Sequence, residues 1–167
     1  YGTLEYVDYF YKQLNELLTN YGDVFEIWFD GANGGDGWYG GAKDVRTIDR
    51  KTYYDYPRAY KMIDELQPQA VIFSDGGPGC RWVGNESGFA GATNWSFLRA
   101  GEVYPGYPKY RELQYGHADG NQWVAAECDV SIRPGWFYHP EEDDKVKTVD
   151  QLTDLYYRSV GHNATLL

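Results

Sequence analysis

Hydrophobic residues recur every three or four positions in three stretches of the chain, which is the spacing of an amphipathic helix. The predicted helices span residues 4–21, 52–66 and 149–160. Gly22, Pro68 and Gly161 follow these stretches, and each is a residue type that commonly ends a helix. Thr52 is a good helix-capping residue, so we expect the second helix to begin there.

Short apolar runs between these helices predict β-strands that are covered on both faces. They span residues 24–29, 70–74 and 123–130, and the apolar run at 165–167 begins a fourth strand. Strands that alternate with helices indicate parallel pairing, so we expect the first three to be neighbouring parallel strands. The predicted fold class is therefore α/β.

The number of strands separates two α/β architectures. A closed parallel barrel needs eight strands, and about four are predicted here. We interpret residues 1–167 as a consecutive portion of a (β/α)8 TIM-like barrel, a partial catalytic domain that is incomplete at both ends. The chain begins at Tyr1 without Met and stops at Leu167 inside an apolar run, which agrees with this interpretation. A small doubly wound sheet is the alternative.

Two long segments show neither the helical periodicity nor the apolar runs of strands. Residues 31–51 contain six glycines and predict a surface loop or a loop that contacts substrate. Residues 75–122 are rich in Gly, Pro and Tyr, and they are too long for a simple connection. We expect this second segment to hold short helices and active-site loops.

A carboxylate stands at the end of each of the first three predicted strands. Asp30 and Asp75 are each followed by glycine, and Glu127 is followed closely by Asp129. Because the carboxyl ends of parallel strands meet at one edge of a sheet, we expect Asp30, Asp75 and Glu127 to lie on the same edge. Converging carboxylates indicate chemistry on a neutral, hydroxyl-rich substrate.

The composition agrees with such a substrate. Aromatic residues make up 18% of the chain, including 17 Tyr and 6 Trp. Most of these rings belong to a core, but Tyr and Trp can also stack on a sugar while their polar atoms bond its hydroxyls. The net charge of -10 argues against nucleic acid as a partner. A mean hydropathy of -0.63 and the lack of a long apolar run exclude a transmembrane helix, and we expect no membrane partner.

The sequence shows no pattern of a metal site or a cofactor site. The three histidines are scattered, and Cys80 and Cys128 have no metal-ligand spacing. We favour two free thiols over a disulfide. Asp30, Asn33 and Asp36 hint at a calcium loop, but the twelfth position of that loop is glycine where an EF-hand has glutamate.

Two carboxylates suit the roles of a retaining glycosidase, which needs an ionised nucleophile and a protonated acid about 5–5.5 Å apart. Asp30 suits the nucleophile because it is short and its strand fixes it. Glu86 suits the acid/base because it has a longer arm, on a loop flanked by Gly84 and Gly88, near aromatic rings that would favour its protonated form. The alternatives are a turn residue for Asp30 and a solvated loop acid for Glu86.

Four stretches of the chain together resemble the glycoside hydrolase family 29 α-L-fucosidases. They are Trp-Phe-Asp-Gly-Ala at 28–32, Arg-Trp-Val-Gly-Asn-Glu at 81–86, the stretch 127–139, and His-Asn-Ala-Thr-Leu-Leu at 162–167. The resemblance covers almost the whole chain and implies a (β/α)8-like catalytic barrel with a retaining mechanism and no cofactor. It implies that Asp30 is the nucleophile and Glu86 the acid/base. The Gly-Asn-Glu context resembles the subgroup that prefers α-1,3/1,4-linked fucosides.

In this interpretation we expect Trp136 to pack against the sugar, with Tyr138 beside it. The expected substrate-binding residues are Trp28, Trp82, Glu127, Asp129, Trp136 and Tyr138. Of these, the two acids would orient hydroxyl groups or Arg133. The family's pocket also uses residues from the first barrel strands, which this chain lacks. We therefore expect activity only when the chain is joined to the missing remainder of its catalytic domain.

The expected function is an exo-acting α-L-fucosidase that removes terminal fucose from an oligosaccharide or glycan. The resemblance implies a periplasmic or extracellular location. One alternative is a non-catalytic sugar-binding module that uses the same aromatic loops. Another is a glycosidase of a different family on the same barrel. The presence of both Asp30 and Glu86 favours an enzyme, because a lectin needs neither a nucleophile nor a proton donor.

Overall fold

The computed structural model describes residues 1–30, 37–39 and 43–167. Its helices are α1 (Leu4–Asn20), α2 (Tyr56–Leu66) and α3 (Val149–Ser159), with 3-10 turns η1 (Tyr110–Gln114), η2 (Pro140–Lys145) and η3 (Val160–His162). Its strands are β1 (Glu26–Trp28), β2 (Gly37–Tyr39), β3 (Asp44–Arg46), β4 (Val71–Ser74), β5 (Cys80–Trp82), β6 (Phe97–Leu98), β7 (Gln122–Trp123), β8 (Ala125–Cys128) and β9 (Ala164–Leu166).

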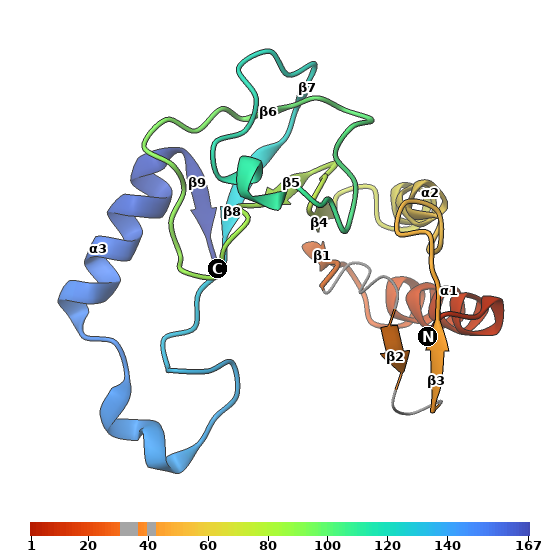
Figure 1. Ribbon diagram of the computed structural model, residues 1–167, viewed down its shortest axis with the longest axis horizontal. Coiled ribbons are helices and arrows are strands. Elements are labelled where there is room, and N and C mark those ends of the chain that lie inside the picture. The colour runs from red at the N-terminus through yellow and green to blue at the C-terminus, as the bar shows by residue number, and fades with distance from the viewer. Residues whose placement is uncertain (31–36, 40–42) are drawn as a thin grey trace.

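Five of these strands form one parallel sheet in the order β1-β4-β5-β8-β9. The predicted α/β class with parallel pairing is confirmed. Figure 1 shows α1 and α2 beyond the β1 end of the sheet and α3 beyond the β9 end. The described residues also form two small antiparallel pairs, β2 with β3 and β6 with β7.

The prediction that 70–74 and 123–130 are adjacent strands was wrong, because β5 lies between β4 and β8. This strand has only three residues, Cys80, Arg81 and Trp82, and its central charge hides it from an apolar-run pattern. The run 123–130 is also not one strand. It divides at Val124 into β7, which pairs with β6, and β8, which joins the main sheet.

Strand register divides the side chains of the main sheet between two faces, because alternate residues point to opposite sides. Ile27 and Ile72 pack with α1 and α2 on one face, in a core with Val7, Tyr11, Leu14, Leu18, Ala59 and Ile63. The opposite face carries Glu26, Trp28, Phe73, Cys80, Trp82, Glu127 and Thr165. Three of these side chains are carboxylic acids or thiols, so this second face is unusually polar for a sheet interior.

The helix ends follow ordinary capping rules, with one departure from prediction. Thr3 caps α1 by accepting a hydrogen bond from the Tyr6 amide, and Thr148 begins α3 in a reciprocal capping box with Gln151. The expected start of α2 at Thr52 was wrong, since the helix begins at Tyr56. The Thr52 hydroxyl instead donates to the carboxylate of Asp49 in a preceding turn.

A buried arginine joins the sheet to the long segment 83–124. Arg81 is 0% exposed, and its guanidinium donates to the carbonyl oxygens of Leu113, Val124 and Trp95 and to Oδ1 of Asn94. Burial lowers the pKa of Arg81 to about 10. These bonds hold the loops on either side of β6 and β7 against β5, so the segment is tied to the sheet although it has little regular structure.

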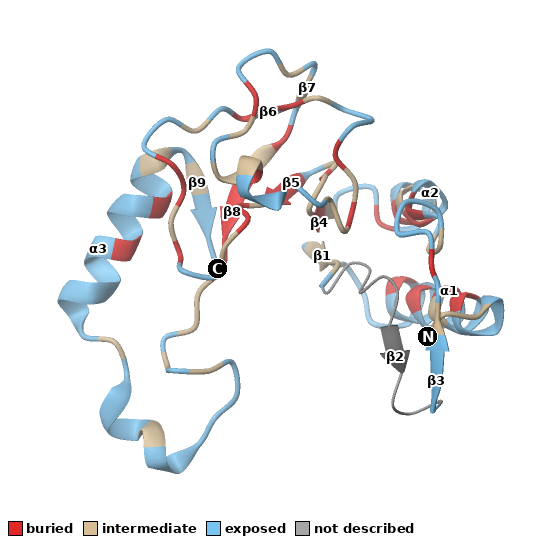
Figure 2. Ribbon diagram, viewed as in Figure 1, coloured by how far each residue is buried: buried red, intermediate tan, exposed pale blue. Residues whose placement is uncertain are grey.

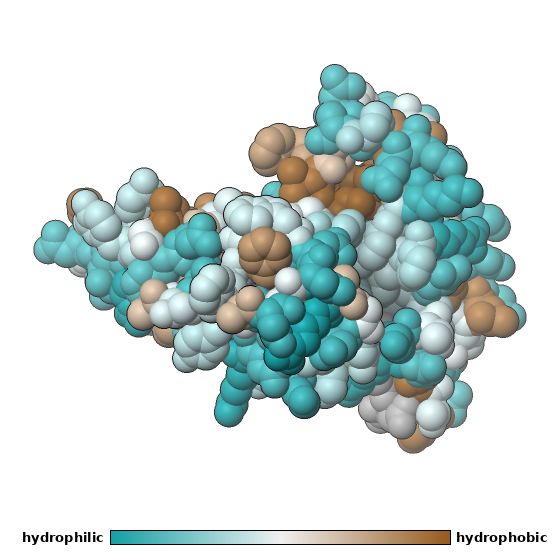
Figure 3. All heavy atoms as spheres, turned by 90° about the horizontal axis from the view of Figure 1, so that it is seen from above, coloured by the Kyte–Doolittle hydropathy of each residue, from teal (hydrophilic) through white to brown (hydrophobic). Residues whose placement is uncertain are grey.

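Burial is greatest in the middle of the main sheet. Figure 2 shows the buried residues concentrated along β4, β5 and β8 and on parts of the three helices. The face shown in Figure 3 is mostly hydrophilic, with hydrophobic residues in separate patches. Among the described residues, no helix is both long enough and apolar enough to cross a membrane.

Candidate active site

A cavity of about 410 Å³ opens at the carboxyl ends of β1, β8 and β9. It is lined by Trp28, Asp30, Glu86, Asp129, Trp136, Phe137 and Leu167. Five of these seven residues belong to the predicted site, although they are scattered over more than 100 positions of the sequence. The cavity therefore combines three carboxylates with three aromatic rings, which suits a substrate that is neutral and rich in hydroxyls.

Asp30 lies two residues beyond Trp28, just past the end of β1, and its side chain is exposed. The amide of Phe29 donates to the carbonyl of Phe73, which extends the pairing of β1 and β4 up to the residue before Asp30. This backbone bond fixes the position from which Asp30 enters the cavity. Asn33 and Asp36, the other members of the apparent calcium loop, lie outside the described residues, as do Gly31 and Ala32.

Two glycines shape the loop that carries Glu86. Gly84 and Gly88 have φ values of 80° and 78°, which are accessible to glycine at little cost. A Cβ at Gly84 would lie 2.3 Å from the carbonyl oxygen of Tyr110, and one at Gly88 would lie 2.7 Å from Val130. Only glycine fits at either position, so the path of this loop is set by close packing on both sides of Glu86.

The Glu86 carboxylate is exposed and has an aromatic neighbour from a distant loop. Oε2 of Glu86 accepts a hydrogen bond of 3.2 Å from Nε1 of Trp136, whose side chain is 53% exposed. The sequence suggested that apolar neighbours such as Trp82 and Phe89 would surround Glu86. In the structure the Glu86 side chain is exposed instead. Glu86 lies at an open mouth of the cavity, where Trp136 orients it.

The loop that carries Trp136 is held by its own polar contacts. Arg133 forms an ion pair of 2.8 Å with Asp143, and the guanidinium lies 4.9 Å from the centre of the Tyr138 ring. The Tyr138 hydroxyl donates to the same Asp143 carboxylate over 3.4 Å. Tyr138, which we expected to contact substrate, does not line the described cavity and instead braces the loop beside Trp136.

Asp129 is the buried acid of the cavity. It is 4% exposed, and its Oδ1 accepts a hydrogen bond of 2.8 Å from Nε1 of Trp82. Burial raises the pKa of Asp129 to about 6, and the nearby Glu86 and Glu127 carboxylates add to the rise, although the Trp82 bond opposes it. Trp82 does not line the cavity, so it contacts the site through Asp129.

Trp28, like Trp82, donates its indole N–H to a carboxylate. Its Nε1 donates a hydrogen bond of 2.9 Å to Oε1 of Glu127, which is 7% exposed and does not line the cavity. The Trp28 ring stacks on Phe73 with centroids 4.1 Å apart and planes only 5° from parallel. One tryptophan that lines the cavity is thus fixed by a neighbouring ring and by a buried acid.

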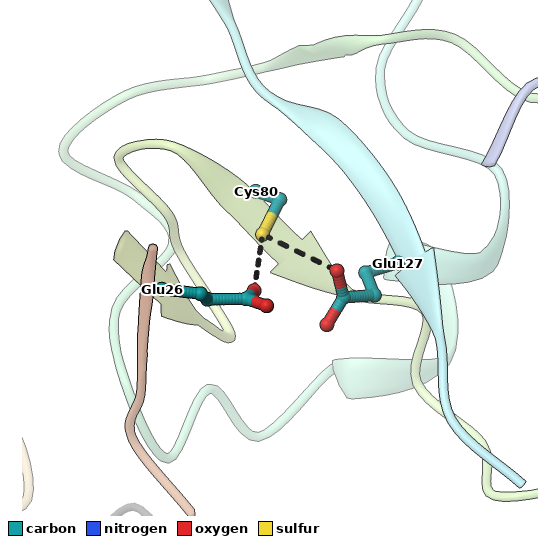
Figure 4. Close-up of side chains that lie close together, drawn as sticks. All are labelled: Glu26, Cys80 and Glu127. Atoms are coloured by element: carbon teal, nitrogen blue, oxygen red, sulfur yellow. Dashed lines mark hydrogen bonds between the residues drawn. The ribbon is translucent and has the colours of Figure 1, made fainter. Parts of the chain in front are cut away.

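Behind the cavity, Glu26, Cys80 and Glu127 point toward one another (Figure 4). One donor atom from each side chain lies within 4.8 Å of the others. These residue types can ligate metals, but burial raises the pKa of the Cys80 thiol far above its usual range, and a metal would require the thiolate. Glu127 also accepts hydrogen bonds from Trp28, Thr165 and Cys80, so its oxygens already have partners.

The expectation that Asp30, Asp75 and Glu127 share one edge holds only in part. Asp75 does not line the cavity and accepts a hydrogen bond of 2.7 Å from the amide of Gly106, and its burial raises its pKa. Glu127 lies within β8 rather than past its end. Asp129, two residues further along the same face, is the acid from β8 that reaches the cavity.

Phe137 and Leu167 line the cavity but were not predicted as site residues. Phe137 belongs to the aromatic run that contains Trp136, so the density of rings in that loop is a signal for it. Leu167 carries no chemical signal. It is placed by backbone pairing, in which its amide donates to the carbonyl of Cys128 and its carbonyl accepts from the amide of Val130. Cys128 and Cys80 are free thiols in the structure, as predicted.

No protein-family model matches the chain. Two curated proteins do: the chain is 45% identical to Alpha-L-fucosidase 1 of Arabidopsis thaliana and 45% identical to Putative alpha-L-fucosidase 1 of Oryza sativa subsp. japonica. All of this chain aligns in both comparisons, but it spans only 30% of the length of either relative.

Solved structures give a similar result. A glycoside hydrolase 29 family member from an unknown rumen bacterium superposes with a TM-score of 0.88 at 56% identity, covering 100% of this chain and 30% of that one. A Ruminococcus gnavus GH29 fucosidase in complex with fucose superposes with a TM-score of 0.73 at 30% identity, covering 97% of this chain and 32% of that one.

Proposed function

We propose that this chain is part of the catalytic domain of a glycoside hydrolase family 29 enzyme, a retaining exo-α-L-fucosidase. The observation that carries the proposal is the convergence of Asp30 and Glu86 on one cavity, between the aromatic rings of Trp28 and Trp136. The similarity to proteins named as α-L-fucosidases supports it, since it extends over the whole chain.

In the proposed mechanism, Asp30 is the nucleophile and Glu86 the acid/base. A carboxylate oxygen of Asp30 bonds to the anomeric carbon of fucose while the bond from that carbon to the leaving oxygen breaks, and Glu86 gives its proton to that oxygen. Glu86 then removes a proton from water, whose oxygen bonds to the anomeric carbon and displaces Asp30. Fucose leaves, and both carboxyl groups return to their starting states.

The two acids occupy different parts of the cavity, which suits this division of roles. Asp30 is exposed at a strand end, whereas Glu86 is on a separate loop beside the buried Asp129. Burial raises the pKa of Asp129, and repulsion from Glu86 adds to the rise. Trp28 and Trp136 supply the apolar faces on which a sugar ring packs.

We also propose that the complete domain is a (β/α)8 barrel of which this chain supplies consecutive units. The support is the parallel order β1-β4-β5-β8-β9 and the packing of α1 and α2 on a single face, with the acids on the other. The alternative doubly wound sheet has helices on both faces. The remainder of the domain would then be the principal partner of this chain, and it would complete the cavity.

The substrate in this proposal is terminal fucose on an oligosaccharide or glycan, with a preference for α-1,3/1,4 linkages suggested by the Gly-Asn-Glu sequence at 84–86. The fucose complex of a structural relative supports a fucose-binding pocket in this fold. We propose a periplasmic or extracellular location, where such glycans are found. Activity on linkage-defined fucosylated oligosaccharides and fractionation of cells that produce the full-length protein test these two points.

Covalent trapping tests the central proposal. The full-length protein is incubated with a 2-fluoro-fucosyl fluoride, digested and analysed by mass spectrometry. A retaining fucosidase gives an adduct on the peptide that contains Asp30, whereas a non-catalytic sugar-binding module gives none. A panel of aryl glycosides separates the third possibility, because a glycosidase of another family would hydrolyse a different sugar faster than the α-L-fucoside.

A further inference from the structure

Two side-chain contacts determine the position of Trp28 in the cavity wall. It lies on β1 two residues before Asp30, so any rotation of its indole would alter the cavity wall next to the proposed nucleophile. Phe73 holds one face of the ring, and Glu127 accepts the indole N–H over 2.9 Å. The ring can therefore present its remaining surface to a ligand only in this orientation.

Side chains from three other strands hold the Glu127 carboxylate in place. Its Oε2 accepts a hydrogen bond of 3.0 Å from the Thr165 hydroxyl on β9, and the Cys80 thiol on β5 donates to the same oxygen over 3.9 Å. Trp28 on β1 occupies Oε1. A carboxylate on β8 thus ties β1, β5 and β9 together on the cavity side of the sheet, with little room to move.

A second carboxyl group lies beside Glu127. Glu26 is two residues before Trp28 on the same face of β1, and its oxygen lies within 4.8 Å of the Cys80 sulfur and a Glu127 oxygen. Burial and the Glu127 carboxylate raise the pKa of Glu26. The indole N–H of Trp28 donates to Glu127 and not to Glu26.

We infer that Glu127 is a positioning residue for the sugar-binding wall, which holds the Trp28 indole beside Asp30 through the hydrogen bond that its Oε1 accepts. The inference deepens the proposed function and rests on it for the identity of the ligand. Glu127 acts on the sugar through Trp28, so it does not need to reach the cavity. This role differs from a hydroxyl-binding role, for which Glu127 would have to line the cavity.

A double-mutant cycle in the full-length protein tests the inference. Glu127→Leu removes the acceptor while keeping a side chain of similar size, and it should raise KM for an aryl α-L-fucoside roughly tenfold with a smaller effect on kcat. Glu127→Gln keeps one acceptor oxygen for the indole and should restore most of the loss. In a Trp28→Phe background, which has no indole N–H, Glu127→Leu should cost less than about twofold.

Glu26→Gln is the matched comparison within the same cluster. Glu26 belongs to the same cluster but does not accept the indole N–H, so this change should raise KM less than about threefold, well below the effect of Glu127→Leu. If Glu26→Gln is the more damaging of the two, the assignment of the positioning role to Glu127 is overturned. An equal loss for Glu127→Leu with and without the Trp28 N–H would overturn the coupling to Trp28.

A second measurement does not depend on activity. In protein labelled with ¹⁵N-tryptophan, the signal that disappears in Trp28→Phe identifies the Trp28 indole N–H. Exchange of this hydrogen with solvent should be slow in the unaltered protein and faster by at least an order of magnitude in Glu127→Leu. An unchanged signal and exchange rate overturn the inference. If Glu127→Leu does not fold, the exchange rates in the unaltered protein and in Glu127→Gln are used instead. Slow exchange in both supports the inference, and fast exchange in the unaltered protein overturns it.

Failure of the proposed function gives a different result. In that case the unaltered full-length protein hydrolyses no α-L-fucoside and forms no adduct on Asp30. The indole exchange experiment still reports whether Glu127 holds Trp28, so the two failures can be told apart.

Discussion

The indole N–H of Trp136 donates a hydrogen bond of 3.2 Å to Oε2 of Glu86, which joins two loops that lie 50 residues apart in the sequence. Glu86 is at an open mouth of the cavity and has few other constraints beyond the two glycines that flank it. The bond therefore helps to decide where the proposed acid/base points. It also places an exposed tryptophan next to the proposed proton donor.

Replacing Trp136 with phenylalanine tests this contact. The ring is kept and the hydrogen bond is lost, so kcat/KM for an aryl α-L-fucoside should fall about threefold to tenfold, with the exposed position of the bond favouring the lower value. Steady-state kinetics of the full-length enzyme measure the effect. Phe97, an exposed ring paired edge-on with Trp123 away from the cavity, provides a control. Phe97→Leu should leave kcat/KM within about twofold.

Glu86→Ala should distinguish substrates by their leaving groups. Acid assistance matters most for a basic leaving group, so natural fucosides should lose far more rate than activated aryl fucosides. The measurement is kcat/KM over a series of aryl fucosides of graded leaving-group pKa. A uniform loss across the series would remove Glu86 from the acid role and direct attention to Asp129, the other acid beside it in the cavity.

Asp30→Ala should abolish nearly all turnover, because the nucleophile is needed whatever the leaving group is. We expect kcat to fall on the order of 10³-fold or more, and azide to restore part of it by attacking the anomeric carbon in place of the missing carboxylate. Product analysis by NMR should show a fucosyl azide of inverted configuration. Near-normal turnover in Asp30→Ala would exclude Asp30 as the nucleophile.

The raised pKa of Asp129 predicts a pH dependence of stability. The folded protein binds this proton more tightly than the unfolded chain, whose aspartate titrates near its ordinary value. Asp129 therefore favours folding at low pH, and its contribution falls as pH rises from about 4 to about 6. The full loss is on the order of 3 kcal/mol, and it is complete about one pH unit above the folded pKa of about 6.

Asp129→Asn removes that titration while keeping an acceptor for Trp82. Between pH 4 and pH 7, the difference in unfolding free energy between Asp129→Asn and the unaltered protein should shift in favour of the variant. Denaturant unfolding of both proteins at a series of pH values checks this. A difference that stays constant with pH would show that Asp129 does not titrate in this window.

Arg81→Lys should destabilise the protein strongly. Lysine has no planar fork, so several of the buried acceptors that Arg81 satisfies would lose their partners, at a cost of about 3 kcal/mol. Arg99→Lys is the matched control, because Arg99 forms an exposed ion pair with Asp119 and its replacement should leave the unfolding midpoint almost unchanged. Unfolding midpoints of the two full-length variants compare them directly.

Several features follow from the sequence alone because they are local. Helical periodicity identifies α1 and α3 almost to their ends, since the residues that form a helix face are neighbours in the chain. The apolar runs identify β1, β4 and β9 for the same reason. Asp30 and Glu86 also follow from local signals, namely a strand that ends in an acid and a loop bounded by glycines.

Other features were decided by tertiary packing. β5 is three residues long with a charged centre, and Arg81 can be buried there because Asn94, Trp95, Leu113 and Val124 of the following segment supply acceptors for its guanidinium. The start of α2 depended on a turn in which Thr52 bonds Asp49 rather than the helix. Neither outcome has a signal in local hydrophobicity.

The contrast between local sequence signals and tertiary packing is clearest at Trp28 and Glu127. They are 99 residues apart in the sequence, yet Nε1 of Trp28 lies 2.9 Å from Oε1 of Glu127. The sequence shows that each is a candidate for a sugar site. It does not show that one holds the other, because their distance depends on the register of β1, β4, β5 and β8 in the sheet. Periodicity determines which face a side chain occupies within one strand, whereas only the assembled sheet determines which side chains from different strands meet.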